Sequence, residues 1–564
     1  MKGMITLLCS VLCYGGSALA QDAVTLNQPD SGYRGIWYSN QPSQDEYKYK
    51  YSGGLGTYPA NHYPFSVYAK AVNKTFFCYG GTDATGSTLL HMVSYFDHNT
   101  GLVPRPTVVL DKKTDDAHDN PVLNIDEDGY IWLFSTAHGT SGPSYIHKSI
   151  KPYDISAFVQ VRPTKLVDGT EVPMNNFSYL QAWFQPGKGF IHLFTHYDRN
   201  VIPGQPAKPR RTISYMTSPD GIRYSAWTDI GAIEEGHYQT SGQAGTKLGS
   251  AFNFHPVVKE GNGLNYRSNL YYVQTTDFGK SWTTAEGEPL QLPLRTRDNI
   301  ALVKDYYSQG LNVYINDLAF DNEGRPVILY VTGKGYEAGP ANGPRTWHTA
   351  RFTGRSWEIL PVTISDNNYD MGSLYVDGKG VWRIVGPTAE GAQAYNTGGE
   401  MVLWTSRDQG RTWASRKMTA NSPYNHSYAR RPVNVHDGFY AFWADGHGRK
   451  KSASRLYFSD KKGNVYLLPE SMHSEFAKPQ QVKLKKEKEK QKNNMKKYRT
   501  YLLLLWSMIP QAIMAQQTDA RLTNLGPQVS ATMIQGSLFL EDGKGKEWLY
   551  TVVRGSPLIC LGMM

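Results

Sequence analysis

Two histidines, a tyrosine and an arginine form the combination in this sequence best suited to acid–base chemistry. His118 and His138 lie twenty residues apart, and Tyr179 and Arg199 follow along the chain. Imidazole has a pKa near neutral pH, a tyrosine hydroxyl can donate or accept a proton at a leaving oxygen, and a guanidinium binds a carboxylate through two hydrogen bonds. An arginine beside a carboxylate also stabilises a carbanion-like intermediate. These residue types predict removal of a proton next to a carboxylate.

Seven recurring hairpins are the elements that must bring these distant residues together. Each contains an apolar strand, a short turn rich in Asp, Asn and Gly, and a second strand richer in aromatic residues. Such turns favour tight hairpins, and regular repeats of this length indicate blades stacked around an axis. We therefore expect residues 21–470 to form an all-β, seven-bladed β-propeller. The predicted turns are Asn73, Asp126–Gly129, Pro186–Gly189, Glu260–Gly263, Asp321–Gly324, Asp377–Gly380 and His436–Gly438.

The geometry of a blade selects the residues that face the propeller axis. The innermost strand begins at the central channel, and its hairpin partner returns to the same face of the disc. Residues about eight positions before and about nine positions after each turn should therefore converge on one surface. For the second hairpin this rule selects His118 and His138. The third hairpin gives Tyr179 and Arg199, and the first gives His62.

Further aromatic and basic residues are expected to contact a substrate at the same surface. The predicted substrate-binding residues are Tyr238, Arg267, Tyr428, Arg430 and Arg431. Arg267 has an alternative role, which is to pair with a neighbouring blade.

A structural metal ion is an additional expectation, although the proposed chemistry requires no cofactor. His255 and His348 are candidate zinc ligands, because imidazole is a common ligand of zinc. Neither a cysteine nor a third histidine at ligand spacing accompanies them. A structural calcium or zinc ion thus stays open.

The formal charge of +10 does not indicate nucleic-acid binding. Residues 478–499 hold ten basic and two acidic residues, and Lys2 adds one more positive charge. The rest of the chain carries about +1, without the basic surface that phosphate binding requires.

The N-terminus has the layout of a secretory signal. Lys2 precedes an apolar run, and small residues end the segment at Ala20, so residues 1–20 are expected to be removed on export. Outside that segment the thiols are Cys78 and Cys560, which predicts a fold without disulfides, stabilised by a large core. We expect an exported, periplasmic or extracellular, monomeric propeller without a membrane span.

The C-terminal region departs from the rest in composition. Residues 471–494 form a Lys/Glu-rich linker, and residues 495–516 have the layout of a second signal peptide. A transmembrane anchor is the alternative, but the apolar stretch is shorter than the ~20 residues that cross a bilayer. We interpret residues 517–564 as the truncated start of a second exported β-protein, joined by fusion of two reading frames.

Three turns resemble the Asp box of sialidase-like propellers. They are Ser218–Gly221, Thr276–Trp282 and Ser406–Trp413. In the Asp box the aspartate caps its own turn and the tryptophan packs between blades. These turns predict structure and not catalysis, because they occur in enzymes and lectins alike.

Four longer segments carry a resemblance to a known family. They are Gly32–Tyr38, Lys50–Pro59, Asn265–Tyr272 and His426–Pro432. They look like the BNR-repeat-containing propeller family of carbohydrate-active enzymes, and the likeness extends over about residues 31–460. That family includes ulvan lyases, rhamnose–glucuronate lyases and an exo-α-L-rhamnosidase. The resemblance implies an acidic, rhamnose-containing polysaccharide or oligosaccharide as the partner.

The lyase branch of that family implies β-elimination at a glucuronate linked to rhamnose. Its members use two histidines with a tyrosine and an arginine, and His118 and His138 match the spacing of the histidines. Tyr179 and Arg199 are the nearest counterparts of the other two, with Arg211 as a rival for the arginine.

Two other functions stay open. The rhamnosidase branch implies hydrolysis of a terminal α-L-rhamnose linked to glucuronate, with His62 as the central residue. A propeller without catalytic activity could use its axial aromatic residues to stack on sugar rings. A shared fold does not choose among these functions.

Overall fold

The computed structural model describes residues 25–55, 61–140, 142–198, 210–258 and 263–484, and four strands between residues 530 and 563. The chain divides into two units, residues 1–485 and 486–564. The expected signal segments, 1–20 and 495–516, lie outside the described residues.

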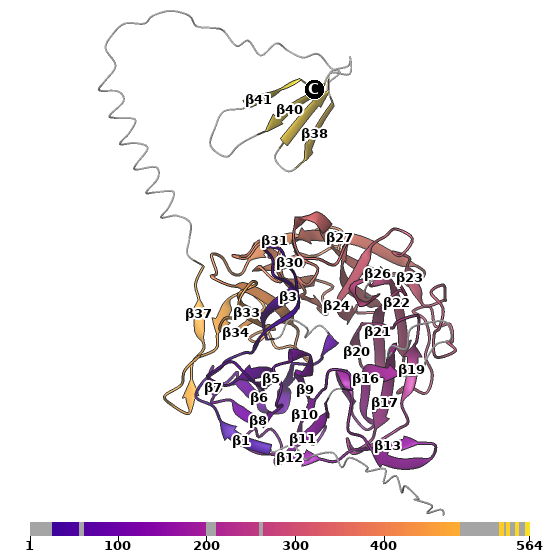
Figure 1. The fold of residues 1–564 in the computed structure, drawn as a ribbon, viewed down its shortest axis with the longest axis vertical. Coiled ribbons are helices and arrows are strands. Elements are labelled where there is room, and N and C mark those ends of the chain that lie inside the picture. The colour runs from indigo at the N-terminus through magenta and orange to yellow at the C-terminus, as the bar shows by residue number, and fades with distance from the viewer. Residues whose placement is uncertain are drawn as a thin grey trace, which may run out of the picture. The chain divides into compact units, whose positions relative to one another are not determined.

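Antiparallel sheets of four or five strands build the first unit, and Figure 1 shows them arranged around a common centre. The first three sheets, in the order of their paired strands, are β1 (Thr25–Pro29), β8 (Thr107–Asp111), β6 (Leu89–Asp97), β5 (Lys74–Thr82), β4 (Ser66–Ala69); β12 (Phe158–Val161), β11 (Tyr145–Ser149), β10 (Ile131–Ser135), β9 (Pro121–Ile125); and β15 (Ser178–Gln185), β16 (Gly189–Asp198), β17 (Arg210–Ser218), β19 (Thr228–Gly231).

Four further sheets continue around the disc in chain order. They are β20 (Gln239–Ala244), β21 (Lys247–Phe254), β22 (Ser268–Thr275), β23 (Leu302–Lys304); β24 (Asn312–Phe320), β25 (Pro326–Gly333), β26 (Arg345–Phe352), β27 (Trp357–Ser365); β28 (Ser373–Val376), β29 (Trp382–Ala389), β30 (Glu400–Ser406), β31 (Ala414–Lys417); and β32 (Asn425–Arg430), β33 (Ala441–Gly446), β34 (Leu456–Ser459), β35 (Val465–Leu467), β37 (Gln480–Val482).

Smaller elements decorate these sheets. They are the pair β2 (Trp37–Pro42) and β3 (Tyr49–Gly54), the group β13 (Thr164–Val167), β14 (Thr170–Pro173) and β18 (Arg223–Tyr224), the pair β7 (Val103–Pro104) and β36 (Phe476–Ala477), and the 3-10 turns η2 (Lys70–Val72), η3 (Ala117–Asp119), η4 (Gly263–Asn265) and η5 (Pro340–Asn342).

The all-β propeller fold is confirmed, but the predicted count of seven blades is corrected. Within the described residues, eight sheets have four or five strands. Seven lie between residues 25 and 482, and the eighth belongs to the second unit. The eighth consists of β38 (Ser530–Ile534), β39 (Ser537–Glu541), β40 (Glu547–Thr551) and β41 (Ile559–Met563). The prediction missed it because the tail was excluded as the start of another protein.

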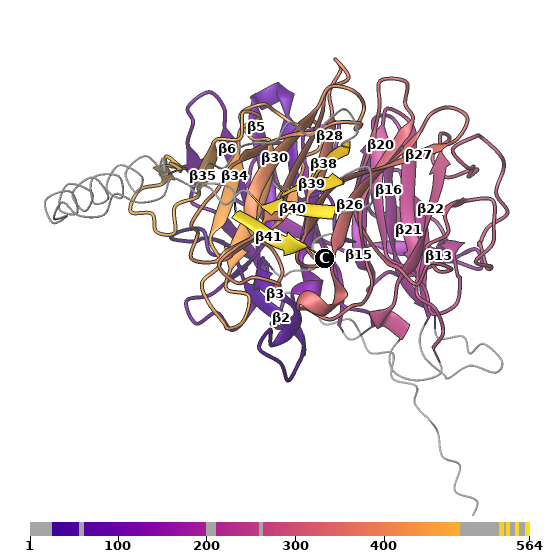
Figure 2. The same ribbon diagram turned by 90° about the horizontal axis from the view of Figure 1, so that it is seen from above.

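The first and last sheets of the first unit are tied together, so that its disc is closed. Strand β36 pairs with β7, and Val67 forms a bridge with Val433. Figure 2 shows strands of neighbouring sheets standing side by side. Phe77 in β5 packs on Phe442 in β33, with ring centroids 5.2 Å apart, so the closure has an apolar core.

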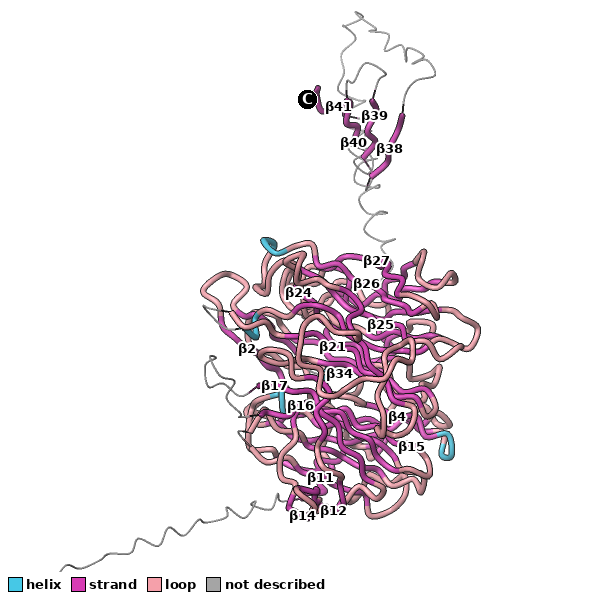
Figure 3. Tube along the Cα trace, turned by 90° about the vertical axis from the view of Figure 1, so that its right-hand side faces the viewer, coloured by secondary structure: helices cyan, strands magenta, loops and turns pink. Residues whose placement is uncertain are grey.

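Strands dominate the described chain, and its helices are single 3-10 turns (Figure 3). No described helix has the length and apolar character needed to span a membrane. Strand β25, with the sequence PVILYVTG, is buried throughout, as expected for a run of β-branched and aromatic residues between two neighbours in a sheet. Cys78 is buried and free.

One predicted hairpin turn is wrong. In the fourth sheet the first hairpin turns between Ala244 and Lys247, which pair with each other, whereas Gly263 follows β21. Gly245 supplies the positive φ, 59°, that this tight turn needs. The Gly-rich segment at 260–263 also has the composition of a tight turn, and the sequence alone did not distinguish it from the turn at Gly245.

Candidate active site

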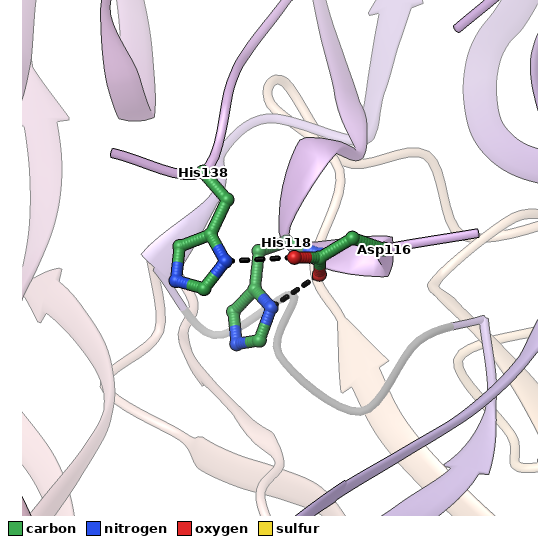
Figure 4. Close-up of side chains that lie close together, drawn as sticks. All are labelled: Asp116, His118 and His138. Carbon is green, nitrogen blue, oxygen red and sulfur yellow. Dashed lines mark hydrogen bonds and ion pairs between the residues drawn. The ribbon is translucent and has the colours of Figure 1, made fainter. Parts of the chain in front are cut away.

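The centre of the candidate site is a carboxylate that holds two histidines. Asp116 accepts hydrogen bonds from both rings, at 2.5 Å from Nδ1 of His118 and 2.7 Å from Nδ1 of His138. The two imidazoles are stacked, with centroids 4.0 Å apart and planes at 19°. Figure 4 shows both Nδ1 atoms directed at Asp116 and both Nε2 atoms on the opposite side. The predicted convergence of His118 and His138 is thus present in the structure.

Local capping explains why Asp116 faces this way. Asp116 precedes the 3-10 turn η3, and its side chain accepts a hydrogen bond of 2.9 Å from the backbone N–H of His118. This is the usual role of aspartate at an N-cap. The end of β10 is fixed to the same turn, because the Thr136 hydroxyl donates to the Asn120 carbonyl at 3.0 Å. The sequence that closes the turn therefore also orients the histidines.

Two tyrosines from the β2–β3 pair complete the surroundings of His118. The Tyr51 hydroxyl lies 2.8 Å from Nε2 of His118, and the Tyr38 hydroxyl lies 3.1 Å from Nδ1. Because Nδ1–H of His118 donates a hydrogen bond to the carboxylate, neutral His118 offers the lone pair of Nε2 to the Tyr51 hydroxyl. The side chain of His118 is 3% exposed, whereas that of His138 is 34% exposed. His138 is therefore the imidazole that solvent can reach.

Burial and the carboxylate act on the protonation of this group in opposite directions. Burial lowers the pKa of His118, and Asp116 partly opposes that effect. Burial would raise the pKa of Asp116, but its hydrogen bonds to the two histidines hold the pKa far below the usual range. Asp116 therefore stays ionised over the whole physiological range.

Tyr179 lies beside the histidine pair, as predicted. Its ring centroid is 6.1 Å from that of His118 and 6.2 Å from that of His138. The backbone of Tyr179 has φ of 50°, at a register shift between Ser178 and Gln181. A tyrosine in this left-handed conformation costs on the order of 1–3 kcal/mol, and such strain concentrates at functional sites. The side chain is buried, with 2% exposed.

Arg211 supplies a guanidinium near Tyr179. Arg199 lies outside the described residues. Arg211 pairs with Tyr197 across β16 and β17, and its guanidinium lies 5.2 Å from the Tyr197 ring centroid. Burial lowers the pKa of Arg211, but Tyr197, Tyr238 and Tyr179 act more strongly and raise it. No carboxylate among the described residues forms an ion pair with Arg211.

His62 lies in the same neighbourhood but is closed off from solvent. Its ring centroid is 5.5 Å from that of Tyr179, and the residue is 0% exposed. Burial, assisted by the nearby His118 and Arg430, lowers its pKa to about 3. Neither ring nitrogen has a hydrogen-bond partner among the described residues.

The predicted substrate contacts divide into two groups. Tyr238 packs against Tyr179 at 5.7 Å, and the Arg267 guanidinium lies 4.7 Å from the Tyr238 ring centroid. Arg267 also donates to the Tyr369 hydroxyl at 3.1 Å. Tyr428 lines a small cavity with Tyr238 and Arg267. These three residues therefore adjoin the site.

The two remaining arginines are engaged elsewhere. Arg430 is 1% exposed and donates to the Asn316 carbonyl at 2.9 Å. Arg431 forms an ion pair with Asp317 at 3.3 Å and lines a separate cavity with Asn124 and Gln243. The structure does not bring either guanidinium to Asp116.

The candidate metal ligands also lie apart. His255 binds the Tyr266 carbonyl through Nδ1 at 2.9 Å, and Nε2 of His348 lies 3.0 Å from the Thr332 hydroxyl. Among the described residues, the one group of three ligand-type side chains close enough to hold a metal is Asp116 with His118 and His138. In that group, the Nδ1 atoms of both histidines are already hydrogen-bonded to Asp116. This arrangement favours an acid–base centre over a metal site.

Asp116 and the two tyrosines from the β2–β3 pair were not among the predicted site residues. Asp116 stands two residues before His118, and an N-cap aspartate next to a chosen histidine was the signal for it. Tyr38 and Tyr51 come from the separate two-stranded pair of β2 and β3. Their separation from His118 by about 80 and 67 residues leaves no local signal.

Comparison with known proteins finds one matching family model. Residues 105–365 match the family described as BNR repeat-containing. The resemblance to the BNR-repeat family is confirmed.

Two curated relatives of this chain are ulvan lyases. The ulvan lyase of Alteromonas sp. (strain LOR) is 23% identical over 334 residues, which cover 53% of this chain and 63% of that protein. The PL25 ulvan lyase of Pseudoalteromonas sp. (strain PLSV) is 23% identical over 275 residues, which cover 43% and 51%. The chain therefore spans less than two thirds of the length of either relative.

Solved structures are similar in fold to this chain. A PL25 ulvan lyase structure superimposes with a TM-score of 0.56 and 16% identity, covering 77% of this chain and 96% of that one. A second structure, of a PL25 ulvan lyase bound to -[GlcA(1-4)Rha3S]-, gives a TM-score of 0.55 at the same identity. These likenesses show the shared propeller fold.

Proposed function

We propose that the protein is a polysaccharide lyase that performs β-elimination at a uronic acid, glucuronate, linked to rhamnose. The observation that carries this proposal is the stacked pair of His118 and His138 on Asp116, next to Tyr179 and Arg211. The pair supplies proton transfer, and the arginine supplies a positive charge without a described carboxylate partner.

Arg211 neutralises the carboxylate of the uronate in this mechanism. The acidity of the C5–H bond depends on how well the negative charge that develops on the carboxylate is stabilised. A guanidinium that binds both carboxylate oxygens provides this stabilisation and positions the sugar. Arg199 stays the alternative for this role.

His118, His138 and Tyr179 share the two proton transfers. A base takes the C5 proton, the electron pair forms the C4–C5 double bond, and the bond from C4 to the leaving oxygen breaks. A general acid then protonates that oxygen. His138 is the member that reaches solvent, with its Nδ1 proton held by Asp116 and the Nε2 lone pair directed away from it. We therefore assign the substrate-side proton acceptor to His138.

The named relatives support the substrate class. Two curated relatives are ulvan lyases, and one similar structure holds a glucuronate–rhamnose-3-sulfate unit. For this chain the linkage between glucuronate and rhamnose is a proposal that rests on those similarities together with the arginine.

The hydrolase alternative places His62 at the centre. That imidazole is 0% exposed, and this burial disfavours direct contact with a sugar. The third alternative, a propeller that only binds carbohydrate, would leave the Asp116-bound pair of imidazoles without a use.

One assay separates the three functions. The purified chain is incubated with ulvan and with rhamnose-capped arabinogalactan, while ultraviolet absorbance of unsaturated uronate and free rhamnose are followed. The lyase produces new absorbance. Rhamnose release without absorbance identifies the hydrolase, and binding without either signal identifies a carbohydrate-binding propeller.

We further propose that residues 1–20 direct export and that the propeller acts as a monomer.

The turns at Asp277 and Asp408 are proposed Asp boxes, because each carboxylate accepts a 2.9 Å hydrogen bond from a backbone N–H four residues ahead. The assignment of 471–494 as a linker and of 517–564 as a fused fragment also stays a proposal.

A further inference from the structure

Arg430 is a buried cation in β32, the first strand of the last sheet of the first unit. It is 1% exposed, and one nitrogen, Nη1, donates to the Asn316 carbonyl at 2.9 Å. Its guanidinium also lies 5.2 Å from the Tyr63 ring centroid. Nε and Nη2 are buried and have no hydrogen-bond partner in the described part of the chain. A buried guanidinium with two unused N–H groups is costly, because buried charges need a partner.

The nearest carboxylate is already used by a second arginine. Asp317 pairs with Arg431 at 3.3 Å through both Nε and Nη2. The same carboxylate accepts the backbone N–H groups of Leu318 and Leu374, at 2.9 and 2.8 Å. Two arginines thus share one carboxylate, which leaves one buried positive charge without an equal negative charge among these residues.

Residues that contact Arg430 carry further unsatisfied polar groups. The amide of Asn316 has neither its nitrogen nor its oxygen bonded, and the Tyr63 hydroxyl also lacks a partner. His62 is close enough for Arg430 to help lower its pKa, so this imidazole is neutral at working pH and keeps one N–H donor. All of them are 0–1% exposed.

We propose that the buried, unpartnered N–H groups of Arg430, together with the amide of Asn316, bind a small inorganic anion of the size and charge of chloride. An anion of this size accepts several N–H and O–H donors at once and balances the charge that Asp317 leaves uncompensated. Carboxylates and sulfate are too large for an enclosed position between strands. The donor atoms of Arg430, Asn316 and Tyr63 are buried among strands of separate sheets, so an occupant must be small.

Such an anion would connect separate sheets of the disc. Arg430 belongs to β32, Asn316 to β24, and Tyr63 precedes β4. Binding to the folded state alone stabilises a protein in proportion to the logarithm of ligand concentration above Kd. The inference goes beyond the proposed lyase activity and does not depend on it.

The first test measures the melting temperature of the full chain in sodium chloride and in sodium gluconate at equal ionic strength. Gluconate is too large to enter the enclosed position. We expect chloride to raise Tm by about 3 °C once it exceeds its Kd about 100-fold. Arg430→Met should abolish the difference between the salts. In Asn316→Asp a built-in carboxylate replaces the anion, so the difference should also disappear.

Arg345→Met is the matched control, because Arg345 is equally buried, at 1% exposed, but has Asp370 and Asp366 nearby. The chloride response should persist in this variant. An equal response to chloride in Arg430→Met and in wild type would overturn the proposal.

The second test needs no variant to fold. Wild-type crystals soaked in sodium bromide are measured near the bromine absorption edge. An anomalous peak within hydrogen-bond distance of the Arg430 guanidinium is expected. A water molecule at that position, with no anomalous signal, would overturn the proposal.

Discussion

The imidazole rings of His118 and His138 lie stacked, with centroids 4.0 Å apart and both Nδ1 atoms bound to the carboxylate of Asp116. One carboxylate thereby fixes the orientation of two potential acid–base groups, one buried and one open to solvent. The two rings differ in environment, so they can differ in role.

His138→Ala should abolish elimination and leave the fold intact. The imidazole is partly exposed, so its removal leaves no large cavity in the core. A general acid–base group contributes about 10²–10⁴-fold to the rate. Turnover of uronate polymer and the melting temperature are measured together, with His473→Ala, at an exposed position, as the control. Near-wild-type turnover in His138→Ala would show that the assigned site is wrong.

Asp116→Asn should lower the rate and move the acid side of the pH profile. Asp116 opposes the effect of burial on His118, so loss of the charge lowers the pKa of His118 further. His118, which shares the proton transfers with His138, then stays neutral at lower pH. The acid limb of kcat/KM should therefore shift to lower pH, while the maximum falls about 100-fold. A profile with an unchanged acid limb would contradict the coupling.

Arg211→Met should reduce kcat/KM by about 10²–10³-fold, because the developing charge on the uronate loses its counterion. Arg211→Lys keeps the charge but cannot bind both carboxylate oxygens, so an intermediate loss is expected. Esterification of the uronate carboxylate provides the matched substrate. If Arg211→Met reduces activity equally on esterified and free uronate, the guanidinium does not act on the carboxylate.

The repeated hairpins predicted the propeller and the meeting of His118 with His138, because strand spacing alone fixes which residues reach the axis. The position of Tyr179 followed from the same rule. The same rule did not decide between Arg199 and Arg211. It depends on the path of a chain segment between β16 and β17, and local spacing carries no information about that path.

Contacts between residues far apart in the sequence could not be predicted from local patterns. Tyr51 reaches His118 from a strand pair outside the seven sheets, and no periodic pattern marks that contact. The fourth hairpin was misplaced because two Gly-containing segments, near Gly245 and Gly261, carry the same turn signal.

Acid should weaken the closure of the disc through a second histidine pair. His98, after β6, and His436, between β32 and β33, have ring centroids 3.7 Å apart. Burial lowers the pKa of His98 to about 4, helped by His436 and opposed by Asp97. Burial also lowers the pKa of His436, opposed by Asp437. A depressed pKa means that the stability is fully present above about pH 6.5 and is lost as pH falls toward about 4.

The measurement is the free energy of unfolding at several pH values for wild type and His98→Gln. Glutamine retains a donor toward the Thr75 hydroxyl, which lies 2.8 Å from Nε2 of His98. The acid-dependent loss should shrink by about 1 kcal/mol in the variant, allowing for solvent screening. Identical pH dependence in the two proteins would exclude the pair as the cause.

Removal of residues 486–564 should leave the propeller unchanged. These residues form a separate unit, and the closure of the disc is made by strands before residue 485. The melting temperature and turnover of the shortened chain should match those of the full chain. A loss of turnover with the fold retained would give the second unit a role in activity.

The most direct measurement of the central claim is digestion of ulvan in water labelled with heavy oxygen, followed by mass spectrometry of the products. Elimination forms the C4–C5 double bond without adding water, so the account predicts unsaturated uronate ends that carry no label. Saturated products that carry the label would identify hydrolysis and contradict the account.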